Sequence, residues 1–333
     1  MIIKDYSYYT SYDIRRNRRG FVGKKSLTAL LIFVLIIFFM FVKSFIQTPK
    51  EFVLSASVMS PLSDAKTTQT PSPAPILSKE SSSLEKIVSS ALTNTKGEYA
   101  VGILNLKTGE QYFLNGHKQF ESASLYKLWV MGAVYKKIEE GLLSSDQILS
   151  EDVKILNEKF KIDEEVAEKK EGSIKLSVKD ALNLMITQSD NYAALLLAAK
   201  IRLSFVQNFL DDFGLTESKV GTASLPPTIT AYDTVLFFNK LYNGEFSTSE
   251  NNKKMLNFLK GQVLNSKLPK YLPDNTEFGH KTGELGQYSH DGGIVFTNAG
   301  DYIIAVLSRS SSPKDANERI AEISRGVYKY FVE

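Results

Sequence analysis

The sequence predicts an α/β protein of the α+β type, in which strands from both ends of a globular region form one mixed sheet and helices are inserted between them. Alternating apolar and polar residues predict two strands, 98–106 and 110–116, joined by a short turn. Three more strand patterns close the region at 276–283, 292–298 and 301–309. Between the two groups of strands, apolar residues recur at helical spacing.

Helical periodicity predicts the remaining elements of the globular region. Ser177 is the expected N-cap of the helix that follows it, because Asp180 three positions later completes a capping-box pattern. Gly141 is the expected C-terminal stop of the helix that begins at Leu125. The predicted helices span 83–92, 125–141, 177–188, 191–200, 204–213, 230–242, 249–260 and 314–331.

The composition is that of a mainly globular protein, since 43% of the 333 residues are hydrophobic and 23% are charged. The absence of cysteine excludes disulfides, a cysteine nucleophile and thiolate metal sites. The three histidines, His117, His280 and His290, lack metal-ligand spacing, and we expect His280 to be exposed to solvent. We therefore expect neither a metal nor another cofactor.

The positive charge is concentrated at the N-terminus. Residues 1–26 contain seven of the 40 Lys and Arg residues and two of the 37 Asp and Glu residues, which leaves the rest of the chain with a net charge of −2. A globular region without excess positive charge does not indicate a nucleic-acid partner.

The first 82 residues are typical of a membrane anchor followed by a linker. Residues 27–42 contain no charged side chain, and the apolar stretch 27–46 is long enough to cross a bilayer as a helix. Because the basic residues precede it, the positive-inside rule places the N-terminus in the cytoplasm and the rest of the chain outside. Residues 47–82 are rich in Ser, Thr and Pro, which favours an extended linker.

Other interpretations of this N-terminal region remain open. The stretch NRRGFVGKK loosely resembles a twin-arginine export signal, and LSAS at 54–57 is a weak candidate for a cleavage site. We favour an uncleaved anchor, because the apolar stretch is long for an export signal. The expected organisation is a basic tail (1–26), a signal-anchor helix (27–46), a linker (47–82) and one monomeric extracytoplasmic domain (83–333) at the cell membrane.

One of four Ser-x-x-Lys pairs in the chain stands at the start of an apolar helix. Ser124 and Lys127 lie on one helix face, about 4.5 Å apart along its axis, so the lysine amine can reach the serine hydroxyl. A buried lysine holds its proton less tightly and can serve as a base. The alternative is a helix cap beside a solvated lysine, and the spacing alone does not decide between them.

Two later tripeptides have positions that suit a binding site. Ser189-Asp190-Asn191 separates two predicted helices, so its side chains can point into a cleft, although a simple helix cap is the alternative. Lys281-Thr282-Gly283 ends a predicted strand, where a lysine can hold a carboxylate. Trp129 and Tyr135 are expected core residues, and the charge run 163–171 is expected to be a solvated face without a function.

Ser-x-x-Lys, Ser-Asp-Asn and Lys-Thr-Gly in this order resemble the motif set of class A β-lactamases and penicillin-binding proteins. The resemblance covers roughly residues 83–333 and includes SASLYKLWVMGAVYKKIEEGLLSSDQ, LSVKDALNLMITQSDNYAALLL and HKTGELGQYSHDGGIVF. It implies a β-lactamase/transpeptidase-like fold, with a five-stranded antiparallel sheet flanked by helices and an all-helical region. It also implies a serine hydrolase without a cofactor, acting on a β-lactam or a D-Ala-D-Ala-like small molecule.

The resemblance also implies roles for individual residues. Ser124 would be the acylated nucleophile, Lys127 its base or proton relay, and Ser189 the donor of a proton to the departing nitrogen. The implied substrate-binding residues are Asn191, which would hold Lys127 and the substrate's acyl amide, Lys281 and Thr282, which would bind its carboxylate, Gly283, and Glu284, whose backbone N–H would form the oxyanion hole with that of Ser124.

The sequence departs from the family where class A β-lactamases carry the glutamate that activates the hydrolytic water. The corresponding interval 214–227 is short, lacks the usual Glu-x-x-Leu-Asn pattern and contains one acid, Glu217, which stands too early to match and is expected at the surface. We therefore expect slow β-lactam hydrolysis. The alternatives are a D,D-carboxypeptidase or endopeptidase of peptidoglycan, and a protein that binds β-lactams or muropeptides without turnover.

Overall fold

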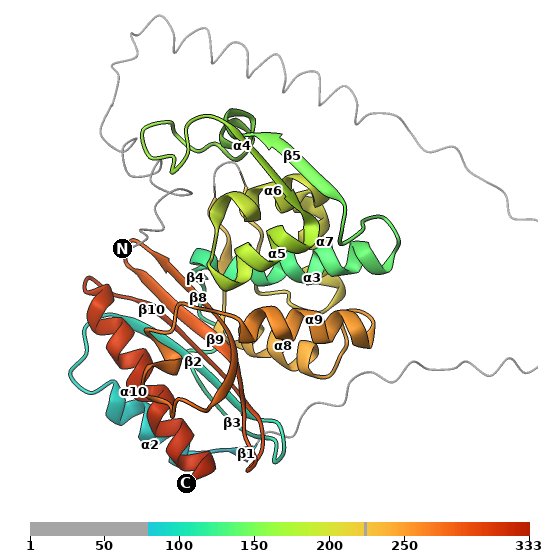
Figure 1. Ribbon diagram of the computed structural model, residues 1–333. Coiled ribbons are helices and arrows are strands. Elements are labelled where there is room, and N and C mark those ends of the chain that lie inside the picture. Colours follow the sequence, from blue (N-terminus) through green and yellow to red (C-terminus); the bar gives the residue numbers. More distant parts are fainter. Residues whose placement is uncertain (1–78, 223–224) are drawn as a thin grey trace, which may run out of the picture. The chain divides into compact units, whose positions relative to one another are not determined.

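The computed structural model describes residues 79–222 and 225–333 (Figure 1). The expected basic tail and membrane helix, and the linker up to residue 78, lie outside the described residues. The described fold begins at Lys79, four residues before the predicted start of the globular domain.

The main sheet has the strand order β1-β3-β2-β10-β9-β8. Five of these strands pair antiparallel with their neighbours, as expected, and the two-residue β1 adds a short parallel pairing beside β3 at the edge. The C-terminal β10 pairs along its whole length with β2 on one side and β9 on the other, so both ends of the domain share one sheet. The strands are β1 (Lys79–Glu80), β2 (Glu98–Asn105), β3 (Glu110–Leu114), β8 (Glu277–Leu285), β9 (Tyr288–Phe296) and β10 (Tyr302–Arg309).

The central strands are buried on both faces, and their residues alternate between two cores. In β10, Tyr302, Ile304 and Val306 pack with α2 (Ser82–Ala91) and α10 (Pro313–Val332), whereas the residues between them face the helical block. This alternation follows from the two-residue period of a strand. The apolar run of β10 therefore joins the two halves of the domain.

The helices on the other side of the sheet form the all-helical region (Figure 1). Two of them contact the sheet, α8 through β2, β9 and β10 and α9 through β8, and α9 also contacts α3 and α5. The helices of this region are α3 (Tyr126–Glu139), α4 (Val153–Phe160), α5 (Val178–Thr187), α6 (Asn191–Ile201), α7 (Leu203–Asp212), α8 (Ala231–Tyr242) and α9 (Ser249–Lys260).

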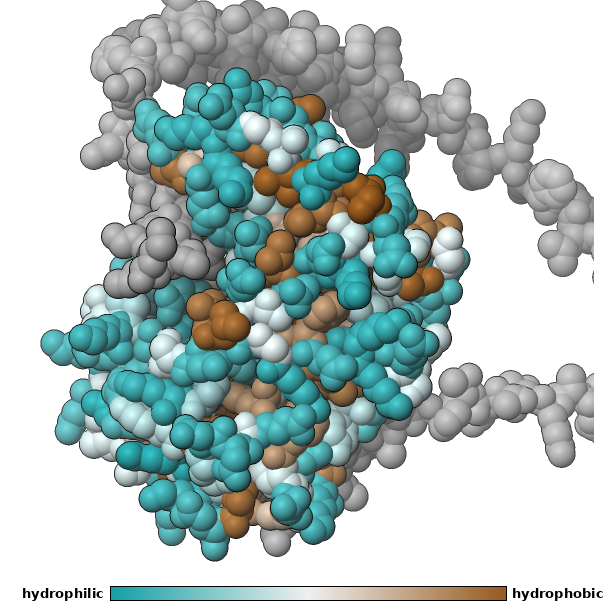
Figure 2. Space-filling view, in the orientation of Figure 1, coloured by the Kyte–Doolittle hydropathy of each residue, from teal (hydrophilic) through white to brown (hydrophobic). Residues whose placement is uncertain are grey.

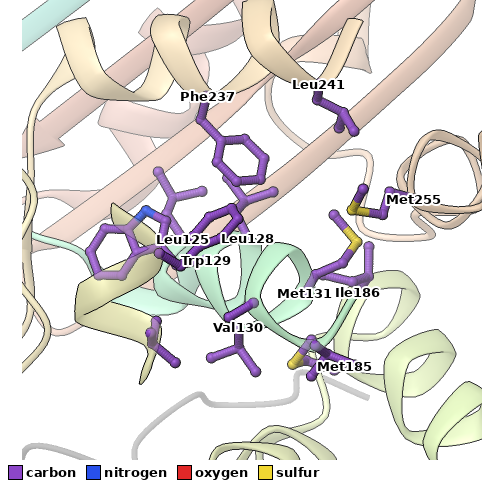
Figure 3. Packing of buried hydrophobic residues seen from close by; sticks show 14 of the residues in the cluster. Leu125, Leu128, Trp129, Val130, Met131, Met185, Ile186, Phe237, Leu241 and Met255 are labelled. Carbon is purple, nitrogen blue, oxygen red and sulfur yellow. The ribbon is translucent and has the colours of Figure 1, made fainter. Parts of the chain in front are cut away.

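Helix α3 is buried over most of its circumference, which places it at the centre of the larger core. Trp129 and Tyr135 are buried in that core, as expected. A methyl group on Gly132 would come within 2.4 Å of Phe209, so this glycine lets α7 approach closely. Figure 3 shows the side chains of α3 surrounded by those of three other helices: Met185 and Ile186 of α5, Phe237 and Leu241 of α8, and Met255 of α9.

The predicted helices are all present, within a few residues of their expected ends. The sequence pattern missed the short elements, because strands of two to five residues that are partly exposed carry little periodicity. The missed elements are β4 (Phe120–Glu121) paired with β7 (Thr228–Ile229), β5 (Ile148–Asp152) paired with β6 (Ser173–Ser177), α4, and the 3₁₀ turns η3 (Ala123–Leu125) and η4 (Leu268–Tyr271).

Hydrophilic residues predominate on the face of the molecule shown in Figure 2, with apolar residues in small groups among them. Within residues 79–222 and 225–333, no single helix is long and apolar enough to cross a membrane. The helices α6 and α7, which meet at 82°, pass the same test only as a pair, and most residues of α6 are buried in the core.

Candidate active site

Ser124 lies in the 3₁₀ turn η3, immediately before α3. The turn is sharp, since Ala123 has a φ of +43°, in the left-handed region that residues with a side chain rarely adopt. The Ser122 N–H donates to the Pro227 carbonyl oxygen at 2.8 Å, and the Leu125 N–H donates to Ser122 O at 3.0 Å. These bonds hold the serine at the start of the helix, close to the position that the sequence predicted.

Lys127 is completely buried, and its amine meets oxygen atoms from two segments of the chain. Lys127 Nζ lies 3.2 Å from Ser124 Oγ, as the three-residue spacing predicted. It also lies 2.6 Å from Ser189 O, 3.0 Å from Ser189 Oγ and 2.6 Å from Asn191 Oδ1. The structure therefore brings the first two motifs together around one amine.

The two shortest contacts of Lys127 show how this amine can accept a proton. The carbonyl oxygen of Ser189 and Oδ1 of Asn191 can only accept hydrogen bonds, so each takes one N–H of the amine. A neutral lysine has two N–H groups and one lone pair, and these two acceptors use both N–H groups. The lone pair can then accept a proton from the hydroxyl of Ser124 or that of Ser189, and the arrangement suits a general base.

The turn between α5 and α6 presents Ser189 and Asn191 to Lys127. Asp190 caps α6, since its carboxylate accepts from the Ala193 N–H at 2.7 Å, which is the structural alternative considered for this motif. Ser189 has a φ of +59°, in the left-handed region, so its side chain points in a different direction from the capping side chain of Asp190. Asp190 therefore shapes the turn, and the residues on either side of it face the site.

Strand β8 completes the site with the third motif. Lys281 is completely buried, and its Nζ lies 2.9 Å from Ser189 Oγ and 2.6 Å from Thr282 O. The Ser189 hydroxyl is thus within hydrogen-bond distance of two lysines, Lys127 and Lys281. A hydroxyl both donates and accepts, so it can pass a proton between groups on either side.

Gly283 allows β8 to lie directly against the nucleophile turn. A methyl group on Gly283 would come within 2.9 Å of Ser124 N and 3.2 Å of Ala123 Cβ. This close approach places β8 directly beside the backbone nitrogen of Ser124. The side chain of Glu284, the next residue of β8, is 51% exposed, and its Oε1 lies 3.1 Å from Lys267 Nζ.

Lys267 is a buried cation of the site that the sequence did not reveal. Its Nζ donates to Thr282 Oγ1 at 2.6 Å, to Gly283 O at 2.9 Å and to His290 O at 3.1 Å. Lys267 stands in a loop before η4, where no periodic pattern predicts burial. Its position 14 residues before Lys281 is the one signal of its role that the sequence contains.

Glu168 is a second residue that the sequence did not reveal. Its Oε1 accepts a hydrogen bond from Asn191 Nδ2 at 2.8 Å. Glu168 is exposed, as expected for a solvated run, and it contacts Asn191 because the segment folds back onto the start of α6. A carboxylate can only accept hydrogen bonds, so Glu168 also fixes which end of the Asn191 amide faces Lys127.

Glu217, the acid of the 214–227 interval, has both carboxylate oxygens bound away from the serine. Oε1 lies 2.7 Å from His117 Nδ1, and Oε2 accepts from Thr230 Oγ1 at 3.0 Å. Asp233 holds the backbone of this segment, since its Oδ2 accepts the N–H groups of Glu217 and Ser218 at 3.0 and 2.7 Å. The assignment of Glu217 to the surface fits these contacts better than a role as base.

The expectation that His280 is exposed is wrong. His280 points into the domain from β8, where Nδ1 lies 2.9 Å from Asp291 Oδ1 of β9 and Nε2 lies 3.0 Å from Asn265 Oδ1. Alternation along the strand explains this outcome, since His280 shares a face of β8 with Phe278, which packs in one core with Leu268 of η4 and with residues of α10.

His290 is buried beside the same strands and is neutral. Its Nδ1 accepts the Ser308 N–H at 3.1 Å, so its proton is on Nε2, which donates to Glu121 O at 2.8 Å. Burial lowers the pKa of His290 from 6.5 to about 4, and the nearby Lys267 cation contributes in the same direction.

We predict that this histidine makes the fold less stable in mild acid. Its folded pKa is below its unfolded pKa, so the unfolded chain binds a proton first as the pH falls from about 6.5 to about 4. The free energy of unfolding should fall by about 3 kcal/mol across that window because of this group. Urea unfolding of wild type and His290→Gln across the window measures it.

The variant should show a weaker dependence of the free energy of unfolding on pH than wild type. Equal pH dependence in wild type and His290→Gln would contradict the prediction. If His290→Gln does not fold, NMR titration of the wild-type ring should show no protonation above about pH 5.

Comparison with known proteins agrees with this geometry. Residues 82–331 match the family model described as the β-lactamase enzyme family. A β-lactamase of Bacteroides uniformis is 24% identical over 284 residues, which cover 76% of this chain and 93% of that protein. The β-lactamase CARB-4 of Pseudomonas aeruginosa is 24% identical over 264 residues, which cover 74% of this chain and 88% of that protein.

Solved structures share the fold over most of their length. The protein PBP-A superposes with a TM-score of 0.66 at 21% identity, covering 76% of this chain and 97% of that one. The β-lactamase of Sphaerobacter thermophilus gives a TM-score of 0.65 at 23% identity, with 75% and 97% covered. The family match spans about three quarters of the sequence, and the chain therefore belongs to the β-lactamase enzyme family, as a serine β-lactamase-like hydrolase.

Proposed function

We propose that this protein is a membrane-anchored, extracytoplasmic serine hydrolase that is acylated at Ser124 by β-lactams and hydrolyses the resulting ester slowly. The observation that carries the proposal is the position of Lys127 Nζ, 3.2 Å from Ser124 Oγ and bound by two oxygens that can only accept. That arrangement leaves the hydroxyls of Ser124 and Ser189 as the proton donors within reach of the amine.

Acylation follows from these contacts. Ser124 Oγ attacks the β-lactam carbonyl carbon while its proton moves to Lys127 Nζ. Backbone N–H groups of Ser124 and Glu284 stabilise the negative oxygen of the tetrahedral intermediate. The amide C–N bond then breaks, and the departing nitrogen takes a proton from the Ser189 hydroxyl, which Lys127 can reprotonate.

Buried cations and an amide hold the substrate in this scheme. Lys281 and Thr282 bind the β-lactam carboxylate. Lys267, which is paired with Glu284, lies 2.6 Å from Thr282 Oγ1 and holds that side chain in place. Asn191 donates to the acyl amide carbonyl of the substrate while its Oδ1 holds Lys127. Gly283 keeps β8 close enough for these groups to act on one molecule.

Slow hydrolysis is supported by the chemistry of the 214–227 interval. Its one acid, Glu217, is bound to His117 and Thr230. On the side facing α3, Val220, Gly221 and Pro227 line an apolar cavity together with the side chains of α3, α6 and α7. An apolar wall does not activate water, so deacylation depends on Lys127 or Ser189, and loss of a dedicated base typically costs about 10²–10⁴ in rate.

The lack of a dedicated base in the 214–227 interval also favours a second candidate, a D,D-carboxypeptidase or endopeptidase of peptidoglycan peptides. In that enzyme Lys127 and Ser189 would serve both acylation and deacylation. One similar structure is an acyl-enzyme complex of the PBP-A mutant L158E with penicillin G, at 21% identity and a TM-score of 0.63. A protein that traps β-lactams or muropeptides without turnover is the third candidate.

We expect Ser124→Ala to abolish covalent labelling by a fluorescent penicillin and Lys127→Ala to slow it by about 10²–10⁴. The measurement is the second-order acylation rate constant of the full-length chain, with intact mass to locate the ester. Lys136→Ala is the matched control, because it removes an amine from the solvent side of the same helix. Labelling of Ser124→Ala at the wild-type rate would exclude this site.

The lifetime of the ester separates the candidate functions. We expect a chromogenic cephalosporin to be turned over at a low steady rate after a stoichiometric burst, since acylation is better supported than deacylation. A burst without turnover, combined with D-alanine release from a pentapeptide, would replace the β-lactamase proposal with the peptidase. Rapid turnover from the first cycle would refute slow deacylation.

The location at the membrane is also a proposal, supported by the apolar stretch 27–46 and the basic residues before it. The domain is expected outside the cytoplasm as a monomer, with the N-terminus inside. External protease should therefore remove the 83–333 domain from intact protoplasts and leave a membrane-bound N-terminal fragment. Protection of the domain until the protoplasts are lysed would refute this orientation.

A further inference from the structure

Glu168 brings a negative charge to the substrate-binding amide of the site. Its Oε1 lies 2.8 Å from Asn191 Nδ2, and Asn191 Oδ1 lies 2.6 Å from Lys127 Nζ. An amide nitrogen has two N–H donors, and the bond to Glu168 uses one of them. The Glu168 carboxylate is therefore next to the Asn191 amide, which binds the acyl amide of the substrate in the proposed function.

The segment that carries Glu168 is anchored to α6, the helix that begins with Asn191. Ala167, just before Glu168, is buried with Tyr192 in a small core beside α4. Just after it, the Lys169 N–H donates to Tyr192 Oη at 3.2 Å, and that hydroxyl lies 2.8 Å from Lys169 O. The contact between Glu168 and Asn191 is thus held from both sides by residue 192.

Asn157 strengthens this anchor. Its Nδ2 donates to Lys169 O at 2.9 Å, and its Oδ1 accepts from Tyr192 Oη at 2.8 Å. Glu168 itself is exposed to solvent. Because its backbone is held in place and its carboxylate is exposed, Glu168 can attract or repel a charged group on a bound molecule.

We propose that Glu168 is a specificity-determining residue that favours acyl donors with an ammonium group beside the amide bound by Asn191 and disfavours those with a carboxylate there. The inference rests on the proposed function of the site. A carbonyl oxygen that accepts from Asn191 Nδ2 lies about 5–6 Å from Glu168 Oε1, since each hydrogen bond spans about 3 Å. Substituents on the neighbouring carbon are then within reach of its charge.

Three penicillins provide a matched test of this charge preference. Benzylpenicillin, ampicillin and carbenicillin differ at the carbon next to the acyl amide, which carries hydrogen, an amine and a carboxylate respectively. Acylation rate constants of the full-length chain are measured at about pH 6.5, below the usual pKa of an α-amino group. We expect the ampicillin-to-carbenicillin ratio to fall roughly fivefold to twentyfold in Glu168→Gln, a range suited to an exposed charge pair.

The matched control is Glu171→Gln, which removes the same charge from the same exposed segment without touching Asn191; it should keep the wild-type ratio. Glu168→Lys should invert the preference, and added salt should reduce it in wild type. A glutamine can still accept the Asn191 hydrogen bond, so a residue that only positions Asn191 would leave the ratio unchanged in Glu168→Gln.

An unchanged ratio in that variant, or an equal loss of rate with all three penicillins, would overturn the specificity role. An equally longer ester lifetime with all three would also overturn it, by making Glu168 a base for deacylation. If wild type forms no ester at Ser124 with any of the three, the proposed function fails and the specificity role fails with it.

Discussion

The burial of Lys127 is the constraint on which the rest of the site depends. A buried amine is costly unless oxygen atoms surround it, and here they come from Ser124 on the same helix and from the turn between α5 and α6. To supply them, α3 must lie at the centre of the core, with α5 and α6 packed against it. The packing of the helical block and the contacts of Ser124 therefore both follow from the need to surround the buried amine with oxygen atoms.

A second consequence is that two buried amines share one hydroxyl. Lys127 and Lys281 both lie within 3.0 Å of Ser189 Oγ. Two ammonium groups this close would repel each other in a buried setting, which fits the neutral Lys127 amine of the acylation scheme. Lys267, which lies 2.6 Å from Thr282 Oγ1, is paired with Glu284 at 3.1 Å. Glu168 places a negative charge on the Asn191 side of the site.

The fold was largely predictable because its long elements carry strong periodicity. Helices of ten residues or more with apolar stripes, and strands of eight or nine residues buried on both faces, leave clear patterns. The location of the three motifs was predictable from their order along the chain. Their proximity in space was expected from the resemblance, and the contacts of Lys127 and Lys281 agree with it. The prediction that His280 is exposed was wrong, because both faces of its strand are covered and its ring lies against Asp291 and Asn265.

By itself, the sequence determined which of four Ser-x-x-Lys pairs is the candidate catalytic pair, because Ser124 and Lys127 stand at the start of an apolar helix within the segments that resemble the family. It also determined that the 214–227 interval lacks a matching glutamate. Only the tertiary structure decided that Glu168 meets Asn191 and that Lys267 lies under Thr282. Both residues stand in irregular segments, where no periodicity indicates which way a side chain points. Their contacts form only when the loop packs against an element that is distant in the sequence.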